Sequence, residues 1–155
     1  MIRAVFLDVD DTLIDYEPAS RAAFELALGD DAPYEKWLTL EHFERWLSGE
    51  FSDFVTFRNE RMRDFLTLLG REAEAERAAA IEAVRFGGLA ERCTLFEDAL
   101  PALDELRRRD LAIGLITNNE PDHQRGKLAH VGLDKLVDAI VISGELGVAK
   151  PDAAI

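Results

Sequence analysis

The sequence predicts an α/β fold in which a parallel sheet carries an all-helical insertion. From residue 95 onward, apolar strand patterns alternate with helix patterns and the connections are short, which is typical of a parallel sheet with crossover helices. Between residues 15 and 94 only helical spacing is found, without a strand pattern. One apolar strand precedes that helical block, so we expect the block to be inserted after the first strand of the sheet.

The first strand is predicted at Ala4–Leu7, where four apolar or small residues indicate a buried strand. Three acids, Asp8, Asp10 and Asp11, follow it at once. Packed carboxylates repel one another and resist burial. A strand that ends in such a cluster therefore requires a compensating positive charge.

The helical block is predicted to hold four helical segments. Pro18 fits the first turn of the first segment, and Gly29 fits its end. Large apolar side chains recur at helical spacing in the second and third segments, and we interpret the aromatic stripes as core. The fourth segment is rich in alanine and glutamate and ends at Gly87 and Gly88. The segments are 15–33, 34–50, 51–70 and 71–88.

The later elements bring polar residues to the ends of strands. In open parallel sheets, ligands bind beyond the carboxyl ends of the strands. The three predicted strands end in the segments DVDDT, TNN and SGELGVAKP, so a site is predicted at this edge. The elements are a helix at 97–110 capped by Asp98, a buried strand at 111–119, a helix at 122–133, a short strand at 138–143 and a loop at 144–152.

Charge and composition restrict the classes of partner. The chain of 155 residues has 18 Lys and Arg against 31 Asp and Glu, a formal net charge of −13. It lacks the basic footprint that nucleic acids require, whereas small anionic substrates stay compatible because a local cation can invert the field at one site. We therefore expect no nucleic-acid partner.

Cysteine usage and hydropathy predict a cytoplasmic protein. Cys93 is the single cysteine, which fits a reducing compartment, and we interpret it as a buried structural thiol. The first residues do not have the pattern of a signal peptide. No apolar run approaches the roughly 18 residues of a membrane helix, so we expect no membrane partner.

Asp8 and Asp10 form the first candidate pair. At this spacing on an extended segment their side chains point to the same side, with Val9 turned away. A divalent cation would neutralise them, and hard oxygen ligands suit Mg²⁺. One carboxylate could attack phosphorus and the other could transfer protons. The competing interpretation is a set of acidic turn residues that cap a helix.

Two further segments complete the constellation. Thr117 and Asn118 follow a buried strand, and a hydroxyl with a backbone N–H at such a turn can hold phosphate oxygens. Either residue could instead be an ordinary helix cap. Lys150 follows a glycine-bearing loop and could balance the charge of a nucleophile and a phosphate, although a lone lysine is usually solvated.

Together these segments resemble the haloacid dehalogenase-like (HAD) hydrolase superfamily. FLDVDDTL looks like its first motif, LITNN its second and GVAKPD its third, and the helical block resembles the α-helical cap of phosphoglycolate phosphatase-like members. The resemblance implies a Rossmann-like three-layer core with a parallel sheet that is incomplete at the C-terminus. We expect core residues 1–14 and 95–155 and cap residues 15–94.

The resemblance also implies a role for each motif residue. Asp8 would be the nucleophile and Asp10 the general acid/base, with the Asp8 carboxylate and the Asp10 main-chain carbonyl binding Mg²⁺. Thr117 and the Asn118 backbone would hold the phosphate, and Lys150 would stabilise negative charge. Because true dehalogenases lack the second acid, Asp10 favours a phosphatase. We expect an Mg²⁺-dependent phosphatase of small phosphorylated metabolites that forms an aspartyl-phosphate.

The family's fourth motif, an acidic segment that adds Mg²⁺ ligands, does not follow Lys150. Without the strands that flank it in the family, the first strand becomes an exposed apolar edge that favours self-association. Three explanations stay open: a piece of a longer enzyme, which we favour, a sheet completed by a second chain, or an inactive fragment. A non-catalytic binding or oligomerisation module is therefore the alternative function, and a phospho-acceptor receiver domain is disfavoured by the helical block.

Overall fold

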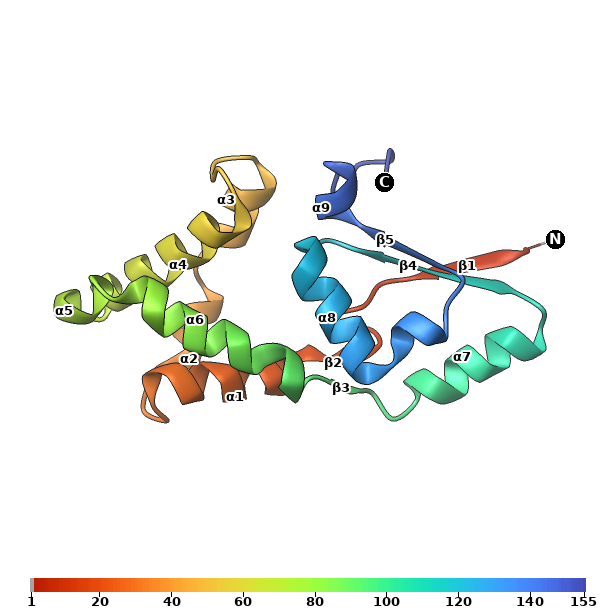
Figure 1. Cartoon of the computed structure of the whole chain (residues 1–155), viewed down its shortest axis with the longest axis horizontal. Helices are drawn as coiled ribbons and strands as arrows, with labels where there is room; N and C mark the ends of the chain where they lie inside the picture. The colour runs from red at the N-terminus through yellow and green to blue at the C-terminus, as the bar shows by residue number, and fades with distance from the viewer. Residues whose placement is uncertain (1) are drawn as a thin grey trace. The chain divides into compact units, whose positions relative to one another are not determined.

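The computed structural model describes residues 2–155 and confirms the α/β fold class (Figure 1). The chain divides into two compact units. Met1–Ala19 together with Ala90–Ile155 form one, the core unit, and Ser20–Leu89 form the other, the helical unit. The helical segment thus interrupts a core unit that is built from both ends of the chain.

The core unit contains a parallel three-stranded sheet. Its strands β1 (Ala4–Leu7), β4 (Ala112–Thr117) and β5 (Ala139–Ile142) lie in the order β1-β4-β5. The helices α7 (Ala99–Arg108) and α8 (Pro121–Val131) precede and follow β4, and Figure 1 draws both on the same side of the sheet. Successive right-handed crossovers in one direction place their helices on one face in this way.

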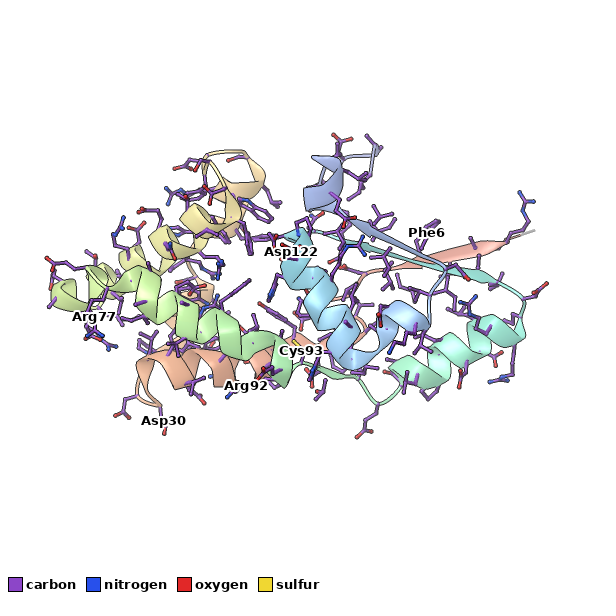
Figure 2. All side chains as sticks on the ribbon, viewed as in Figure 1. Phe6, Asp30, Arg77, Arg92, Cys93 and Asp122 are labelled. Atoms are coloured by element: carbon purple, nitrogen blue, oxygen red, sulfur yellow. The ribbon has the colours of Figure 1, made fainter. Side chains whose placement is uncertain are left out.

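Among the described residues β1 is an edge strand, in agreement with the predicted exposed apolar edge. The prediction of a buried strand from its apolar pattern is wrong. Alternate residues of β1 are exposed, and the Phe6 side chain is 59% exposed. Figure 2 labels Phe6 on the face of the sheet away from α7. A Cβ atom on Gly114, the register partner of Phe6, would lie 2.5 Å from the ring, so the ring lies across the β4 backbone where only glycine leaves room.

A short antiparallel ribbon was not predicted. The strands β2 (Ile14–Asp15) and β3 (Thr94–Leu95) pair where the chain leaves the core and returns to it. Two-residue strands are too short to produce an alternating pattern, and for that reason the sequence does not reveal them. The short helix α9 (Ser143–Leu146) likewise occupies part of the predicted loop. Two 3-10 turns, Ala90–Arg92 and Leu133–Lys135, complete this unit.

The helical unit contains shorter helices than predicted. The segment 34–50 forms two helices instead of one continuous pattern, because the chain turns between Thr39 and Glu41. The segment 71–88 is divided at Glu76 and Arg77. The helices are α1 (Tyr16–Leu28), whose residues up to Ala19 belong to the core unit, α2 (Tyr34–Leu38), α3 (His42–Leu47), α4 (Phe54–Leu68), α5 (Glu72–Ala75) and α6 (Ala78–Leu89).

Aromatic side chains form the centre of the helical unit, which confirms the core assignment for these rings, whereas Phe43 on α3 is exposed. Phe24, Trp37 and Phe65 are buried, and the Phe65 ring centroid lies 5.4 Å from that of Phe24 and 5.5 Å from that of Trp37. These edge-on geometries add to the stabilisation from burial alone. Val55, an apolar residue of the third predicted segment, is in contrast exposed on α4.

Phe65 supplies a test of this core. Replacing Phe65 with alanine removes a fully buried ring that packs on two others, so we expect the free energy of unfolding to fall by about 3–5 kcal/mol. The matched control is Leu68→Ala on the same helix, where the side chain is exposed and a change of at most about 0.5 kcal/mol is expected. Urea denaturation followed by tryptophan fluorescence measures both. Equal losses in the two variants would contradict the assigned core.

Candidate active site

A tight turn presents the acids that follow β1. The Val9 side chain is buried, and its carbonyl oxygen accepts N–H groups from Leu13 and Ile14 at 2.9 and 3.0 Å. Asp11 has φ 57°, a left-handed conformation that aspartate tolerates better than most residues. Its N–H donates to the Ile14 carbonyl at 2.8 Å. The turn therefore fixes the backbone that carries Asp8 and Asp10.

Lys150 reaches Asp8 from the other end of the chain. Its Nζ lies 2.7 Å from Asp8 Oδ1 and donates to the Ile116 carbonyl on β4 at 3.0 Å. Asp8 Oδ1 also accepts the Val9 N–H at 2.8 Å. The contacts from Lys150 Nζ and from the Val9 N–H thus involve the same oxygen of the Asp8 carboxylate. The Asp8 side chain is 48% exposed. The structure thus brings the first and third predicted motifs together, with Asp8 accessible to a ligand.

The Asn118 side chain forms hydrogen bonds with the main chain of Lys150. Its Oδ1 accepts the Lys150 main-chain N–H at 2.8 Å, and its Nδ2 donates to the Lys150 carbonyl at 2.9 Å. The sequence singled out the backbone of Asn118 and not this use of its side chain. The paired hydrogen bonds join the loop after α9 to the end of β4.

Asp10 is held by a lysine that the sequence analysis missed. Lys127 Nζ on α8 donates to both carboxylate oxygens of Asp10, at 2.6 and 2.7 Å. The Lys127 side chain is fully buried, whereas Asp10 remains 24% exposed. The same Nζ lies 4.7 Å from the centre of the Tyr16 ring, within the range of a cation–π contact. The two acids that the sequence places side by side therefore have different cationic partners.

A chain of amide hydrogen bonds connects Asp10 to Thr117. Asn119 Nδ2 lies 3.4 Å from Asp10 Oδ2 and donates to Gln124 Oε1 at 2.7 Å. Gln124 Nε2 in turn donates to Thr117 Oγ1 at 3.2 Å. Thr117 and Gln124 are both buried. Because an amide group both donates and accepts, Gln124 fixes its two neighbours relative to each other.

The sequence contains only a weak indication that Gln124 and Lys127 belong to the site. Residues three apart lie on one face of a helix, so these two polar side chains share the face of α8 that also carries the buried Leu128. His123 belongs to the same helix and is also buried, with an exposed fraction of 9%. Polar residues on a core-facing helix stripe thus mark the interior of the site.

Close backbone contacts fix the start of α8. Glu120 caps the helix by accepting the N–H groups of Asp122 and His123. The Gly144 N–H donates to the Asn119 carbonyl at 3.2 Å, and a Cβ atom on Gly144 would lie 2.8 Å from that oxygen. A glycine is therefore needed where the start of α9 passes the end of β4.

The charges of Asp10 and Lys127 both act on the thiol of Cys93. The thiol is buried, as the sequence analysis predicted, and Figure 2 labels it where the chain leaves the helical unit. Burial raises the pKa of the Cys93 thiol to about 11; the Lys127 charge lowers the pKa and the Asp10 charge raises it. The thiol is thus protonated at neutral pH and is a poor nucleophile.

The oxygen donors at the turn fit Mg²⁺ in part. Within residues 2–155, no group of three or more His, Cys, Asp or Glu side chains is arranged to hold a metal ion. The Asp8 carboxylate nevertheless presents one oxygen, Oδ2, away from the contacts described above. Mg²⁺ often binds through one or two carboxylates and keeps several waters, so this sparse donor set is compatible with that ion.

The family model for haloacid dehalogenase-like hydrolases matches residues 2–155. The chain belongs to the HAD-like hydrolase family. This membership agrees with the three motifs and with the α/β core. The resemblance inferred from the motifs is therefore confirmed.

HAD relatives with phosphatase names support the phosphatase-like subgroup. The chain is 38% identical over 120 residues to Phosphatase MT3486 from Mycobacterium tuberculosis, covering 74% of this chain and 55% of the relative. It is 32% identical over 180 residues to the phosphoserine phosphatase of Thermus thermophilus, covering 97% of this chain and 72% of the relative. The chain therefore spans between about half and three quarters of the length of these curated relatives.

A solved HAD structure shares the fold. The HAD-hydrolase YfnB from Bacillus subtilis, a structure bound to magnesium, superimposes with a TM-score of 0.75 at 22% identity, covering 97% of this chain and 68% of that one. At this identity the likeness concerns the fold alone. No helix among the residues described here is long and apolar enough to cross a membrane.

The raised pKa of Cys93 predicts an unreactive thiol. A pKa of about 11 leaves about 100-fold less thiolate at pH 8 than the ordinary value of 9.0 would. We expect Ellman's reagent to modify the native protein far more slowly than the protein unfolded in guanidinium chloride. Absorbance at 412 nm follows the reaction. A native rate equal to the unfolded rate would contradict the burial of this thiol.

Proposed function

We propose that the chain carries the reaction centre of an Mg²⁺-dependent phosphatase that acts on small phosphorylated metabolites through an aspartyl-phosphate. The observation that carries this proposal is the 2.7 Å contact between Lys150 Nζ and the half-exposed Asp8 carboxylate. A positive charge beside an accessible carboxylate fits a nucleophile that must approach an anionic phosphate. HAD membership and the phosphatase names of relatives support the same reaction class.

Two oxygen donors on the β1 turn would hold the metal ion. These are the Asp8 carboxylate and the main-chain carbonyl of Asp10, with water and substrate oxygens completing the coordination. When bound, Mg²⁺ would neutralise phosphate charge and orient the phosphoryl group.

In the first step, an Asp8 carboxylate oxygen attacks phosphorus. A P–O bond to Asp8 forms while the P–O bond to the leaving group breaks, and a protonated Asp10 donates its proton to the leaving oxygen. Thr117 Oγ1 accepts a hydrogen bond from Gln124, so its own hydroxyl hydrogen is available for a phosphate oxygen. The Asn118 N–H and Lys150 would hold the remaining phosphate charge.

In the second step, water cleaves the aspartyl-phosphate. Asp10, now deprotonated, takes a proton from the water as its oxygen attacks phosphorus. The P–O bond to Asp8 breaks, inorganic phosphate leaves, and both aspartates return to their starting states. The sequence of events uses Asp10 once as an acid and once as a base.

The substrate class is a small anionic metabolite. The net charge of −13 disfavours nucleic acid, and the positive charge of Lys150 is local to the site. Both relatives are named as phosphatases, and one of them is named as a phosphoserine phosphatase. These names do not assign a substrate to this chain. We propose a cytoplasmic location, in keeping with the reduced, buried Cys93.

A second candidate function is self-association through β1. This strand is the edge of the sheet among the described residues, and the Ile2 and Phe6 side chains on it or beside it are exposed. Exposed apolar edges pair readily with other chains. The occupant that we propose is a second copy of this chain, with β1 pairing to β1.

The nucleophile assignment predicts the effect of Asp8→Asn. An amide at this position cannot attack phosphorus, so we expect release of phosphate from p-nitrophenyl phosphate in the presence of Mg²⁺ to fall by at least about 10³-fold. EDTA should abolish release by the parent protein, and added Mg²⁺ should restore it. A malachite green assay measures the phosphate.

Asp11→Asn is the matched control for that variant, because Asp11 lies in the same turn and has no reacting role in the proposed mechanism. Its Oδ1 accepts the Tyr16 N–H at 3.3 Å, and an asparagine side-chain oxygen can accept the same hydrogen bond. We expect its turnover to remain within about threefold of the parent value, since no reacting group is changed. Turnover by Asp8→Asn at the parent rate would exclude the aspartyl-phosphate mechanism. Turnover that resists EDTA would exclude the metal.

The self-association proposal predicts a change with Phe6→Glu. A charge on the exposed edge opposes pairing, so we expect the variant to sediment at the 17.4 kDa of one chain at concentrations where the parent is heavier. Analytical ultracentrifugation over a range of concentrations makes the comparison. A parent protein that stays monomeric throughout would overturn this candidate.

A further inference from the structure

We infer that Lys127 is a positioning residue for Asp10, and that it sets the direction in which that carboxylate faces the reacting phosphate ester. The inference rests on the proposed function, because it concerns the group proposed as acid and base. It adds a residue that lies outside all three motifs. Lys127 acts from the middle of α8, and the motifs lie at strand ends.

The geometry of the pair is specific. Lys127 Nζ contacts both oxygens of the Asp10 carboxylate, at 2.6 and 2.7 Å, which restricts rotation of that group more than a single contact would. The lysine is fully buried and the aspartate is 24% exposed. The cation therefore approaches from the interior, and the aspartate keeps its accessible side toward solvent.

Burial also separates Lys127 from the role proposed for Lys150. The Lys150 side chain is 32% exposed and contacts Asp8, so a substrate phosphate can approach it. Lys127 has no exposed side-chain surface and is covered by Asp10 and by the Tyr16 ring at 4.7 Å. A group so placed acts on the reaction only through Asp10, and for that reason it is a positioning residue.

The amide chain restricts the second oxygen of Asp10. Asn119 Nδ2 approaches Asp10 Oδ2 at 3.4 Å, and Gln124 holds that amide at 2.7 Å while donating to Thr117. Gln124 and Lys127 lie three residues apart on one face of α8. One helix face thus fixes both the proposed acid/base and the proposed phosphate-binding hydroxyl, so movement of α8 would displace them together.

The competing interpretation is that the ion pair only stabilises the fold. Buried pairs often contribute little to net stability, and removing one partner leaves an uncompensated charge. The two interpretations differ in whether the effect of removing Lys127 depends on the Asp10 carboxylate during turnover. A double-mutant cycle measures that dependence directly.

The first experiment compares Lys127→Met with the parent protein on an alkyl phosphate, whose leaving oxygen needs a proton. Misplacing a catalytic group by about 1 Å can lower a rate by about 100-fold, so we expect kcat to fall by about 30- to 100-fold, with KM changing by less than about threefold. The fall in kcat/KM, which reports only the steps up to departure of the leaving group, should be smaller for p-nitrophenyl phosphate, because its leaving group needs no proton. Equal losses on both substrates would overturn the inference.

The matched control is Arg125→Met. Arg125 lies on the same helix, is half-exposed and pairs with Glu145, outside the proposed machinery. Its kcat should stay within about twofold of the parent value, since surface substitutions rarely affect a distant site. A loss equal to that of Lys127→Met would show that any disturbance of α8 suffices, and would overturn the specific role of Lys127.

The cycle uses Asp10→Asn. If Lys127 acts through the carboxylate, adding Lys127→Met to Asp10→Asn should lower the residual kcat by less than about threefold, because the group to be positioned is already absent. The double variant leaves no unpaired charge, so this comparison remains valid where Lys127→Met alone does not fold. A further loss of about 30-fold or more in the double variant would overturn the inference.

An activity-independent measurement separates this inference from the proposed function. Carbon-13 NMR of aspartate-labelled protein reports the Asp10 carboxyl environment, and we expect its signal to move in Lys127→Met and not in Arg125→Met. A parent protein that folds but releases no phosphate would overturn the proposed function for this chain. An Asp10 signal that does not respond to Lys127→Met would overturn the positioning inference.

Discussion

The need to neutralise two neighbouring carboxylates organises the core unit. Asp8 and Asp10 follow one strand, and carboxylates so close to each other in sequence repel unless each has a partner. The structure supplies two lysines from different elements, Lys150 for Asp8 and Lys127 for Asp10. Both lysines come from the C-terminal half of the chain. The β1 turn is therefore complete only when β4, α8 and the loop after α9 have come together around it.

Several local features follow from that convergence. Asn118 pairs with both main-chain groups of Lys150, which fixes the loop at the end of β4. The small size of Gly144 allows the start of α9 to approach the Asn119 carbonyl. Glu120 caps α8 at the same point, so the helix that carries Lys127 begins in a defined place. Each of these features is local, yet together they determine where two charges lie relative to the acids.

The sequence predicts the parts of the site that lie at strand ends. Parallel strands bring their carboxyl ends to one edge, so the proximity of Asp8 and Lys150 follows from the order of elements alone. Lys127 could not be found in that way, because a lysine within a helix usually extends into solvent. The burial of β1 was predicted wrongly for a related reason. An apolar pattern shows which side chains favour burial, and whether they are covered depends on neighbours that a local pattern does not contain.

In the proposed reaction, Lys150 supplies a positive charge that can move and Lys127 supplies one that is fixed. Lys150 is carried by a loop and is partly exposed, so it can adjust as a phosphate enters and leaves. Lys127 is fully buried on a helix whose polar face also holds Gln124, and such a group cannot move without disturbing the packing around it. The cation that pairs with a nucleophile must be able to move when the phosphate arrives. A group that donates a proton in one step and accepts one in the next needs a fixed direction, and a buried ion pair on a rigid helix meets that requirement.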